Sequence, residues 1–207
     1  MKKTSLLCLM IAYLGCPIIF LGQSKPTSQL QLTTDITDAK FCSSDYLRLQ
    51  LRLRYFNSGD QPVILYRESN TIMTYFISKT ISDADAEKHE QKYSPMQSPV
   101  SAPEFRDGEA PDEETFVILE PSASYEVTTN AHLPFIFNGK DKDPDLLRPG
   151  RHVLQIRVQT WPAAQNVGAK LRDRWRGHGH LWTQSLISRP VEFNIPKHPS
   201  VVGCSPN

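Results

Sequence analysis

Four leucines at every second position constrain the fold of this chain more than any other feature of its sequence. They lie between Tyr46 and Asn57, where polar residues separate them: Leu47, Leu49, Leu51 and Leu53 alternate with Arg48, Gln50, Arg52 and Arg54. A period of two places all four leucines on one face of a β-strand, whereas a helix would spread them around its circumference. The segment is therefore predicted to be a strand with one buried and one solvated face.

A second alternation follows Pro149 and Gly150. One face carries His152, Leu154, Ile156 and Val158, and the other carries Arg151, Gln155, Arg157 and Gln159. Shorter apolar or β-branched runs predict further strands at 63–66, 71–80, 116–119, 125–130 and 181–195. The last of these runs is broken at Ser188-Arg189-Pro190, because proline cannot donate to a strand ladder. About seven or eight antiparallel strands without alternating long helices predict an all-β sandwich.

Two segments interrupt the strand pattern. Residues 82–114 contain four prolines and ten acidic against three basic residues, a composition typical of a long polar insertion. Residues 161–180 form a basic connection before the last strand, in which Leu171 and Trp175 at i, i+4 predict one or two helical turns. We therefore predict two long connections between strands, the second of them partly helical.

The first 24 residues have the features of a secretory signal peptide. Lys2 and Lys3 precede an apolar run from 6 to 21, and Gly22 and Ser24 fit a cleavage site after position 24. About 16 apolar residues are fewer than the roughly 20 that span a bilayer. The alternative is a lipoprotein with Cys16 as its lipidated first residue. We expect a secreted or periplasmic protein, attached to a membrane only if Cys16 is lipidated.

The predicted organisation is a signal peptide at 1–24, an N-terminal segment with the first strand at 25–45, a sandwich domain at 46–196 and a C-terminal tail at 197–207. Removing Lys2 and Lys3 with the signal reduces 23 basic residues to 21, against 22 acidic residues. This balance predicts no nucleic-acid partner. Two cysteines remain, Cys42 and Cys204, and in an oxidising compartment an isolated pair predicts one disulfide.

Three stretches resemble bacterial exported immunoglobulin-like domains. They are Tyr55-Phe56-Asn57-Ser58-Gly59-Asp60-Gln61-Pro62-Val63, Leu119-Glu120-Pro121-Ser122-Ala123-Ser124 and Leu147-Arg148-Pro149-Gly150-Arg151-His152-Val153-Leu154. The resemblance implies an immunoglobulin-like sandwich. The chain departs from the motifs at Ser122, where glycine is usual, and at His152, where a corner tyrosine is expected. An imidazole can still donate the corner hydrogen bond.

The implied strand order makes the disulfide geometrically reasonable. It brings the start of the strand at Tyr46 and the end of the last strand at Ile195 to the same end of the sandwich. Cys42 and Cys204 flank these two points. A bridge there would close a loop of about 160 residues and stabilise the fold by roughly 5 kcal/mol at most in the chain-entropy model.

The basic connection is the most distinctive candidate site. Guanidinium groups beside indoles bind carboxylates, phosphates or sulfated sugars through forked hydrogen bonds and stacking. In the implied topology the connection lies at one end of the sandwich, where loops often bind partners. The candidate binding residues are Arg172, Arg174, Trp175, Arg176, His178 and His180. The charge balance favours the other interpretation, in which the connection packs against the oppositely charged insertion of the same chain.

Metal sites and catalytic motifs receive little support. His178 and His180 have a spacing found in copper and zinc sites, but no third ligand follows in the sequence. The spacing of Asp141, Asp143 and Asp145 resembles the start of a calcium loop, yet the Gly and Glu that such a loop requires are missing. No nucleophile elbow is present. We therefore expect no cofactor, no metal and no enzymatic activity.

The sequence favours an exported binding or structural module. Its expected partner is an unknown protein or an anionic glycan at the cell envelope. Protease inhibitors of the BsuPI type are similar in their strand-and-turn texture, and the 82–114 insertion could serve as a presented loop. A secreted inhibitor is therefore the alternative hypothesis. A hydrolase with a site assembled across the fold is the third.

Overall fold

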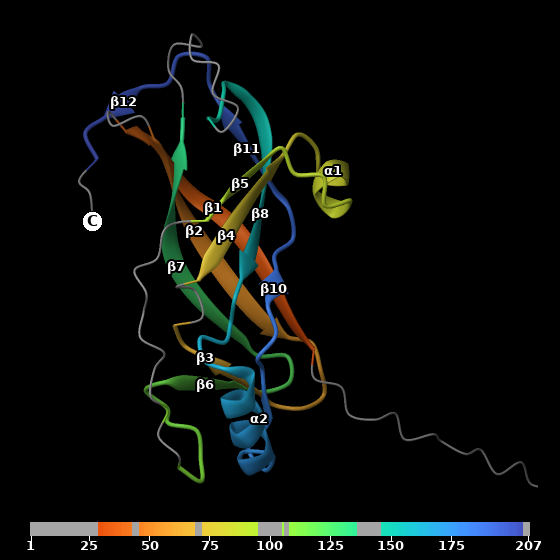
Figure 1. Ribbon diagram of the computed structural model, residues 1–207. Helices are drawn as coiled ribbons and strands as arrows, with labels where there is room; N and C mark the ends of the chain where they lie inside the picture. The colour runs from red at the N-terminus through yellow and green to blue at the C-terminus, as the bar shows by residue number, and fades with distance from the viewer. Residues whose placement is uncertain are drawn as a thin grey trace, which may run out of the picture.

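The computed structural model describes residues 29–42, 46–68, 72–94, 105, 108–135 and 146–204. The predicted signal peptide, Cys16 and the candidate calcium ligands Asp141, Asp143 and Asp145 lie outside the described residues. Within these ranges the fold is mostly β, with a four-stranded sheet A, a three-stranded sheet B, a five-stranded sheet C and two short helices (Figure 1).

The leucine strand lies at the centre of sheet A. β2 (Tyr46–Asn57) pairs antiparallel with β1 (Leu30–Cys42) and with β7 (Ser124–Pro134). The short β12 (Val201–Val202) runs parallel to the end of β1. All four leucines of β2 are buried and its arginines lie on the other face, so the predicted half-buried strand is confirmed.

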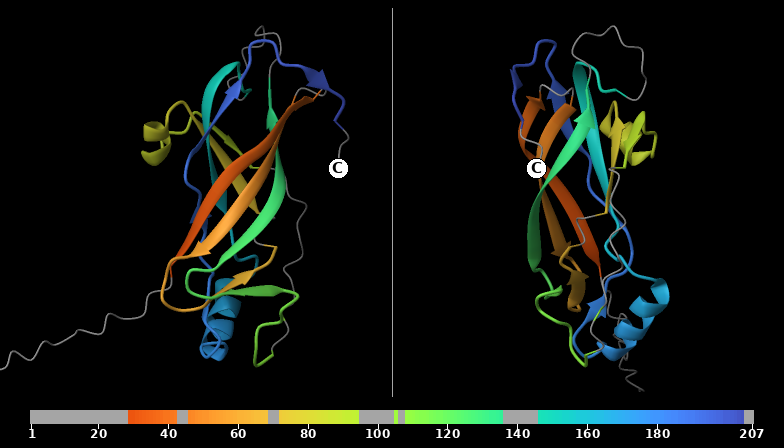
Figure 2. Two further views of the ribbon diagram at one scale, coloured as in Figure 1. Left: turned by 180° about the vertical axis from the view of Figure 1, so that it is seen from behind. Right: turned by 60° about the vertical axis from the view of Figure 1, so that its left-hand side comes forward.

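Sheet C lies opposite sheet A, and the two layers are seen side by side in the right-hand view of Figure 2. Its central strand is β8 (Gly150–Val158), which pairs with β4 (Met73–Ser78), and β5 (Gln91–Tyr93) pairs with β4. Along the other edge of β8 lie β10 (Leu186–Ile187) and β11 (Val191–Ile195).

The gap between β10 and β11 confirms the predicted break at Pro190. Inside the gap, the backbone N–H of Ser188 donates to the carbonyl of Ile156 at 2.8 Å, and the Ile156 N–H donates to the Ser188 hydroxyl at 3.0 Å. The next residue, Arg189, donates its backbone N–H to the carbonyl of Leu32 on β1 at 3.3 Å. Sheets A and C are therefore joined along this edge.

Sheet B and the second helix close one end of the molecule, at the bottom of Figure 1. β3 (Val63–Tyr66) pairs antiparallel with β6 (Phe116–Leu119) and parallel with β9 (His180–Leu181). The helix α2 (Gln165–Arg174) confirms the helical turns predicted in the basic connection. The other helix, α1 (Ile81–Asp85), is a short turn beside β4 and β8.

Two hydrophobic cores lie on opposite faces of β3. The main core lies between sheets A and C and includes the leucines of β2 and Leu154, Ile156 and Val158 of β8, so the two alternating runs face each other as predicted. The second core lies between sheet B and α2 and is largely aromatic: Ile64, Tyr66, Phe116, Trp161, Leu171, Trp175 and Leu181. Because β3 contributes alternate residues to both cores, its whole run is buried.

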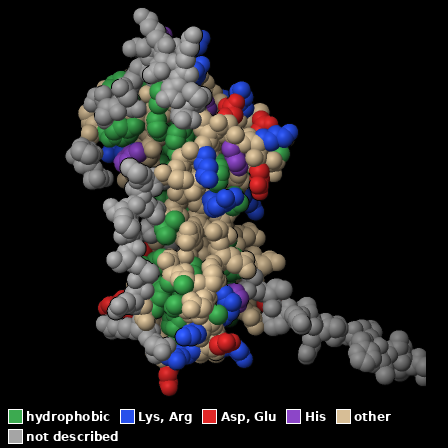
Figure 3. All heavy atoms as spheres, viewed as in Figure 1, with side chains coloured by type: hydrophobic (Ala, Val, Ile, Leu, Met, Phe, Trp, Pro, Cys, Tyr) green, Lys and Arg blue, Asp and Glu red, His purple; other side chains and the backbone are tan. Residues whose placement is uncertain are grey.

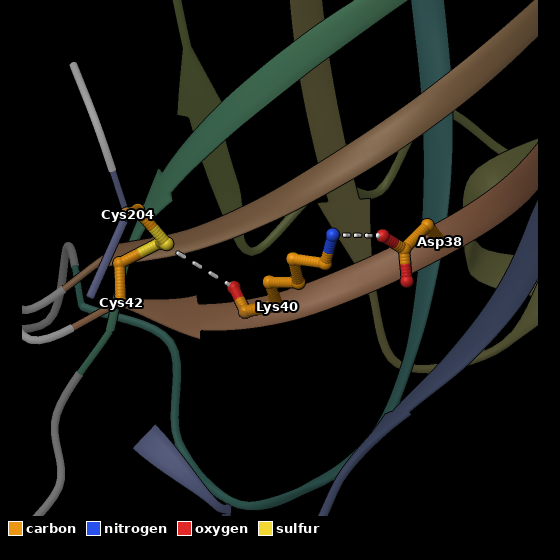
Figure 4. The surroundings of a disulfide bond; sticks show 4 residues. All are labelled: Asp38, Lys40, Cys42 and Cys204. Atoms are coloured by element: carbon orange, nitrogen blue, oxygen red, sulfur yellow. Dashed lines mark hydrogen bonds and ion pairs between the residues drawn. A yellow bond between two sulfur atoms is a disulfide. The ribbon is translucent and has the colours of Figure 1, made fainter. Parts of the chain in front are cut away.

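A disulfide joins Cys42 at the end of β1 to Cys204 just after β12, at the end of the molecule opposite α2 (Figures 1 and 4). The two Cα atoms are 5.3 Å apart, within the usual range for a disulfide. The predicted bridge is confirmed, and its cysteines are separated by 162 positions in the sequence. Bonds of this kind persist mainly in oxidising compartments.

The structure shows what replaces the usual residue at both positions where the chain departs from the immunoglobulin-like turn motifs. Ser122 has φ +66°, in the left-handed region where glycine is favoured and other residues are strained. The imidazole of His152 bonds through Nε2 to the carbonyl of Arg148 at 2.7 Å. Because a carbonyl only accepts, Nε2 carries the hydrogen. The histidine thus makes a local hydrogen bond at the position where the corner tyrosine was expected.

The strand arrangement corrects the predicted sandwich of about seven or eight antiparallel strands. The described residues form three sheets, and β9 and β12 pair in parallel with β3 and β1. The additional strands β5, β9, β10 and β12 have only two or three residues each, too few for a readable alternation. Parallel pairs arise because the chain returns to an existing sheet edge after a long connection. No helix in the described part of the chain is long and apolar enough to span a bilayer.

Candidate anion-binding pocket

A pocket of about 420 Å³ lies where the end of α2 and the loop after it meet the turn between β2 and β3. Its lining is rich in guanidinium and imidazole groups: Gln61, Pro62, Arg172, Asp173, Arg176, Gly177, His178, Gly179 and His180. In the space-filling view, charged side chains gather over this end and over the opposite end of the molecule, in contrast to the middle (Figure 3). The pocket belongs to the segment that the sequence identified as the candidate site.

The turn that forms one wall is held by the buried side chain of Asn57. Its amide nitrogen donates to the carbonyls of Gln61 and Leu119, both at 2.8 Å, and its amide oxygen accepts from the N–H of Gly59 at 3.0 Å. These three bonds tie the β2–β3 turn to the end of β6. They also fix Gln61 and Pro62 at the pocket wall.

Gly179 allows the loop after α2 to pack closely against this turn. It has φ +143°, and a Cβ atom there would lie 2.7 Å from the carbonyl oxygen of Pro62. The following residue, His180, donates its backbone N–H to the same oxygen at 2.8 Å. Position 179 therefore requires glycine, and the close approach sets the place of His180 in the pocket.

Arg172 is a half-buried residue whose guanidinium is held by two of its nitrogens. Nη2 donates to Thr183 Oγ1 at 2.6 Å, and Nε donates to the carbonyl of Leu181 at 3.5 Å. In the described part of the chain Nη1 has no hydrogen-bond partner, and Arg172 lines the pocket. A guanidinium fixed in this way keeps donors for an anion and loses little side-chain entropy on binding.

Arg176 and His178 supply exposed side chains at the rim. Arg176 Nη2 lies 2.8 Å from Asp173 Oδ1, but both side chains are 78% exposed. Such an exposed ion pair contributes little to stability, so an anionic ligand can compete for Arg176. The backbone N–H of His178 donates to the carbonyl of Trp175 at 2.8 Å, which anchors the loop while the imidazole stays exposed.

The surroundings of His180 favour its neutral form. Its pKa lies below the ordinary value of 6.5, first because partial burial disfavours the imidazolium and second because Arg172 is a cationic neighbour. A neutral imidazole offers one donor and one acceptor. The permanent positive charge of the pocket therefore comes from Arg172 and Arg176.

The pocket stands on α2, which is anchored in the second core. Leu171 and Trp175 are 4% and 1% exposed, and the Trp175 ring packs edge-on against Phe116 with centroids 5.0 Å apart. Gly168 faces the neighbouring strand region, where a Cβ atom would meet Thr183 Cγ2 at 3.0 Å. A small residue at 168 thus lets α2 approach the segment that holds the guanidinium of the pocket.

Phe105 and Gly108 of the acidic insertion contact the basic connection. Phe105 stacks on Trp161 with centroids 4.8 Å apart, and the carbonyl of Gly108 accepts the indole N–H of Trp175 at 3.1 Å. These contacts use rings and a backbone carbonyl instead of charges. Among the described residues, the hydrogen-bond and ion-pair partners of Arg172 and Arg176 are Thr183, Leu181 and Asp173. None of these partners belongs to the insertion.

Four of the six candidate binding residues lie together: Arg172, Arg176, His178 and His180 line the pocket. Arg174 is exposed but does not line the pocket. Trp175 does not line it either, because its side chain is buried in the second core. Sequence reasoning missed three contributors from other segments, Gln61, Pro62 and Thr183. The glycine between two histidines is a signal of close backbone approach, but it does not identify the segment that approaches.

The described residues contain no group of three or more His, Cys, Asp or Glu side chains that could hold a metal ion. His178 and His180 have Arg172 and Arg176 as neighbours in the pocket lining, and these charges disfavour a cation. The arrangement is therefore suited to an anion.

Comparisons with known proteins give little further guidance. No protein-family model matches the chain, and no curated protein sequence matches it significantly. Among solved structures, a crystal structure of a candidate ApaA protein from Bordetella pertussis matches with 10% sequence identity and a TM-score of 0.36. The match covers 83% of this chain and 98% of that chain. A similarity this weak supports no inference about ligand or activity.

Proposed function

We propose that this protein is an exported, non-enzymatic binding module that holds an anionic group of a cell-envelope partner. The site is the pocket between α2, β9 and the β2–β3 turn. The observation that carries the proposal is the position of Arg172: Thr183 and Leu181 hold its guanidinium in a pocket lined by a second arginine and two histidines.

The pocket suits a carboxylate or a sulfate group. A guanidinium presents its donors as a rigid fork that matches two oxygens of such a group. Arg176 can leave its exposed pair with Asp173 to bind from the rim, and neutral His180 can donate or accept one hydrogen bond. The partner is therefore an envelope protein with an acidic segment or an anionic glycan.

The test is recovery of a partner from envelope extract by the mature, disulfide-bonded protein. The variant R172Q/R176Q removes two charges from the pocket, and we expect it to lose most of the recovered partner. The matched control is R52Q/R54Q, which removes two charges from the outer face of sheet A. We expect the control to recover as much partner as the wild type.

Unchanged recovery by R172Q/R176Q would contradict the proposal, provided that its thermal unfolding matches that of the wild type. Equal losses in both double variants would contradict it as well, because that result indicates a general effect of net charge. Treating the recovered material with protease or with glycosidases then separates a protein partner from a glycan.

We also propose that the chain is exported to an oxidising compartment, either after cleavage following Ser24 or as a lipoprotein with Cys16 at its start. The disulfide supports an oxidising compartment. Mass spectrometry of the protein from its native cells tests this. A first residue of Lys25 supports cleavage, a lipidated Cys16 supports anchoring, and an intact Met1 with free thiols would contradict export.

For the fold, we propose that sheets A and C are a divergent immunoglobulin-like sandwich. Their shared core and the turn motifs around Ser122 and His152 support this assignment. An experimental structure in which these sheets do not face each other would contradict it. The BsuPI-type inhibitor stays a prediction, and protection of a protease at a near-stoichiometric ratio would favour it.

A further inference from the structure

The outer face of sheet A carries a row of arginines whose partners differ from one end to the other. Arg54 lies directly across from Glu126, with 3.8 Å between Nε and Oε1. Arg52 lies across from Asp35, with 2.9 Å between Nη2 and Oδ2. At both positions a neighbouring strand supplies an acidic residue directly opposite the arginine.

The third position of this row lacks such an acidic residue. Arg48 lies across from Lys40 on β1 and from His132 on β7, and we call these three residues the Arg48 row. Groups of like charge directly opposite each other in a sheet destabilise it. Arg48 is half-buried, and no described residue gives it a hydrogen bond or an ion pair.

The carboxylate of Asp38 lies near the Arg48 row, but it already forms an ion pair with Lys40. Asp38 Oδ2 lies 3.0 Å from Lys40 Nζ, as Figure 4 shows. The pKa of Asp38 is lowered first by its hydrogen bond with Lys40, while Arg48 is the smallest of the causes. Asp38 therefore neutralises mainly Lys40, and no other described carboxylate lies opposite Arg48 in the sheet.

The Arg48 row is both rigid and open. It spans three paired strands, and the disulfide at Cys42 fixes the adjacent end of β1. The Tyr46 ring packs edge-on against His132 with centroids 5.1 Å apart. Neither described helix crosses the outer face of sheet A in the left-hand view of Figure 2. Lys40 and His132 are exposed and Arg48 is half-buried, so a ligand can reach the row from solvent.

We propose that the Arg48 row is an anion-binding site that takes a single oxyanion, a carboxylate or a sulfate group. The guanidinium of Arg48 provides the fork, and Lys40 and His132 flank it from the neighbouring strands. This site lies at the opposite end of β2 from the pocket on α2. It does not depend on the function proposed for that pocket.

The pKa of His132 responds to the positive charge of Arg48 beside it. Its pKa is lowered first by partial burial and second by Arg48. An anion on Arg48 cancels the second cause, so binding should raise the pKa of His132. The titratable and charged groups that face His132 in the described residues are Arg48 and Tyr46 on β2, with Lys40 and Asp38 beyond them on β1.

The test is an NMR titration of the His132 imidazole in the mature, disulfide-bonded protein. Sodium sulfate or sodium acetate replaces sodium chloride at constant ionic strength. We expect a saturable rise in the pKa of His132 in the wild type and at least tenfold weaker binding in R48Q. The control R52Q, which removes the same charge from a paired position, should bind as the wild type does. Whichever anion binds more tightly identifies the preferred group.

Three results would overturn the proposal: no response to either anion, an equal response in R48Q, or an equal loss in R52Q. Stability gives a second readout. Because R48Q removes a like-charge contact, its urea midpoint should equal or exceed that of the wild type. A lower midpoint in R48Q than in R52Q would show that Arg48 supports the fold instead of a ligand.

Discussion

The two ends of this molecule are closed by different means. At one end, the disulfide between Cys42 and Cys204 holds β12 against β1, although Val201 and Val202 are 46% and 43% exposed and pack little. At the other end, aromatic side chains of the second core hold α2 against sheet B. A covalent link needs only two residues, whereas closure by packing needs several segments that fit one another.

This difference explains how the pocket at the α2 end is assembled. Packing at the α2 end brings together a helix, a short strand and a turn from distant parts of the sequence, and the space left between them is lined by their polar ends. The disulfide end also has a pocket, lined by residues that include Gln91, Arg148 and Arg151, but there β12 is held by a covalent bond instead of by a packed core. Removing each closure in turn should therefore affect different parts of the protein.

The largest effect is expected from removing the disulfide with C42S/C204S. The bridge restricts the unfolded chain over a long loop, so its loss should lower the free energy of unfolding by up to about 5 kcal/mol. Urea unfolding measures this loss. Native-state hydrogen exchange should accelerate at β12 and the end of β1 while α2 keeps its protection. Faster exchange at α2 instead would contradict independent closure of the two ends.

The opposite end is tested by W175A, which empties the centre of the second core. A buried Trp changed to Ala costs about 4 kcal/mol, and exchange should accelerate in α2 and β9 first. The matched control is W182A, because Trp182 is only partly buried and packs against the main core. If W182A destabilises as much as W175A, the second core is not what holds α2.

A substitution in the turn between β6 and β7 is expected to stabilise the protein, by less than the two changes above destabilise it. Ser122 adopts φ +66°, so S122G should raise the free energy of unfolding by about 1 kcal/mol. The turn lies beside Asn57, whose carbonyl accepts the Ser122 N–H at 2.9 Å. Thermal unfolding at matched pH measures the gain, and A123G serves as the control. A stability loss in S122G would show that the serine side chain outweighs backbone strain.

The smallest effect concerns protonation in the pocket. Because the folded-state pKa of His180 lies below 6.5, the unfolded chain binds the proton more readily. The stability that neutral His180 contributes is therefore complete above about pH 6.5 and falls as pH drops toward the lower folded pKa. In R172Q the pKa should rise slightly, since burial is the larger cause and remains. NMR titration measures this shift, and a fall in R172Q would contradict the assigned electrostatics.

The main core could be predicted from sequence and the second core could not. Alternation over twelve residues identifies β2 and its buried leucines without knowledge of the partner strands. The second core draws Phe116, Trp161 and Trp175 from separate segments, and its aromatic residues show no period. The same reason explains why Arg172 was identified but its anchor Thr183 was not. The parallel pairs of β9 and β12 were missed because each strand has only two residues.

The central claim is that the α2 end, and specifically its pocket, binds the partner. Photo-cross-linking in the producing cells tests it directly, with p-benzoylphenylalanine placed at Gln61 in the pocket wall or at exposed Ile81 on α1. We predict one adduct from position 61 that disappears in the R172Q/R176Q background, and none from position 81. An adduct from position 81 alone, or one from position 61 that persists without both arginines, would contradict the claim.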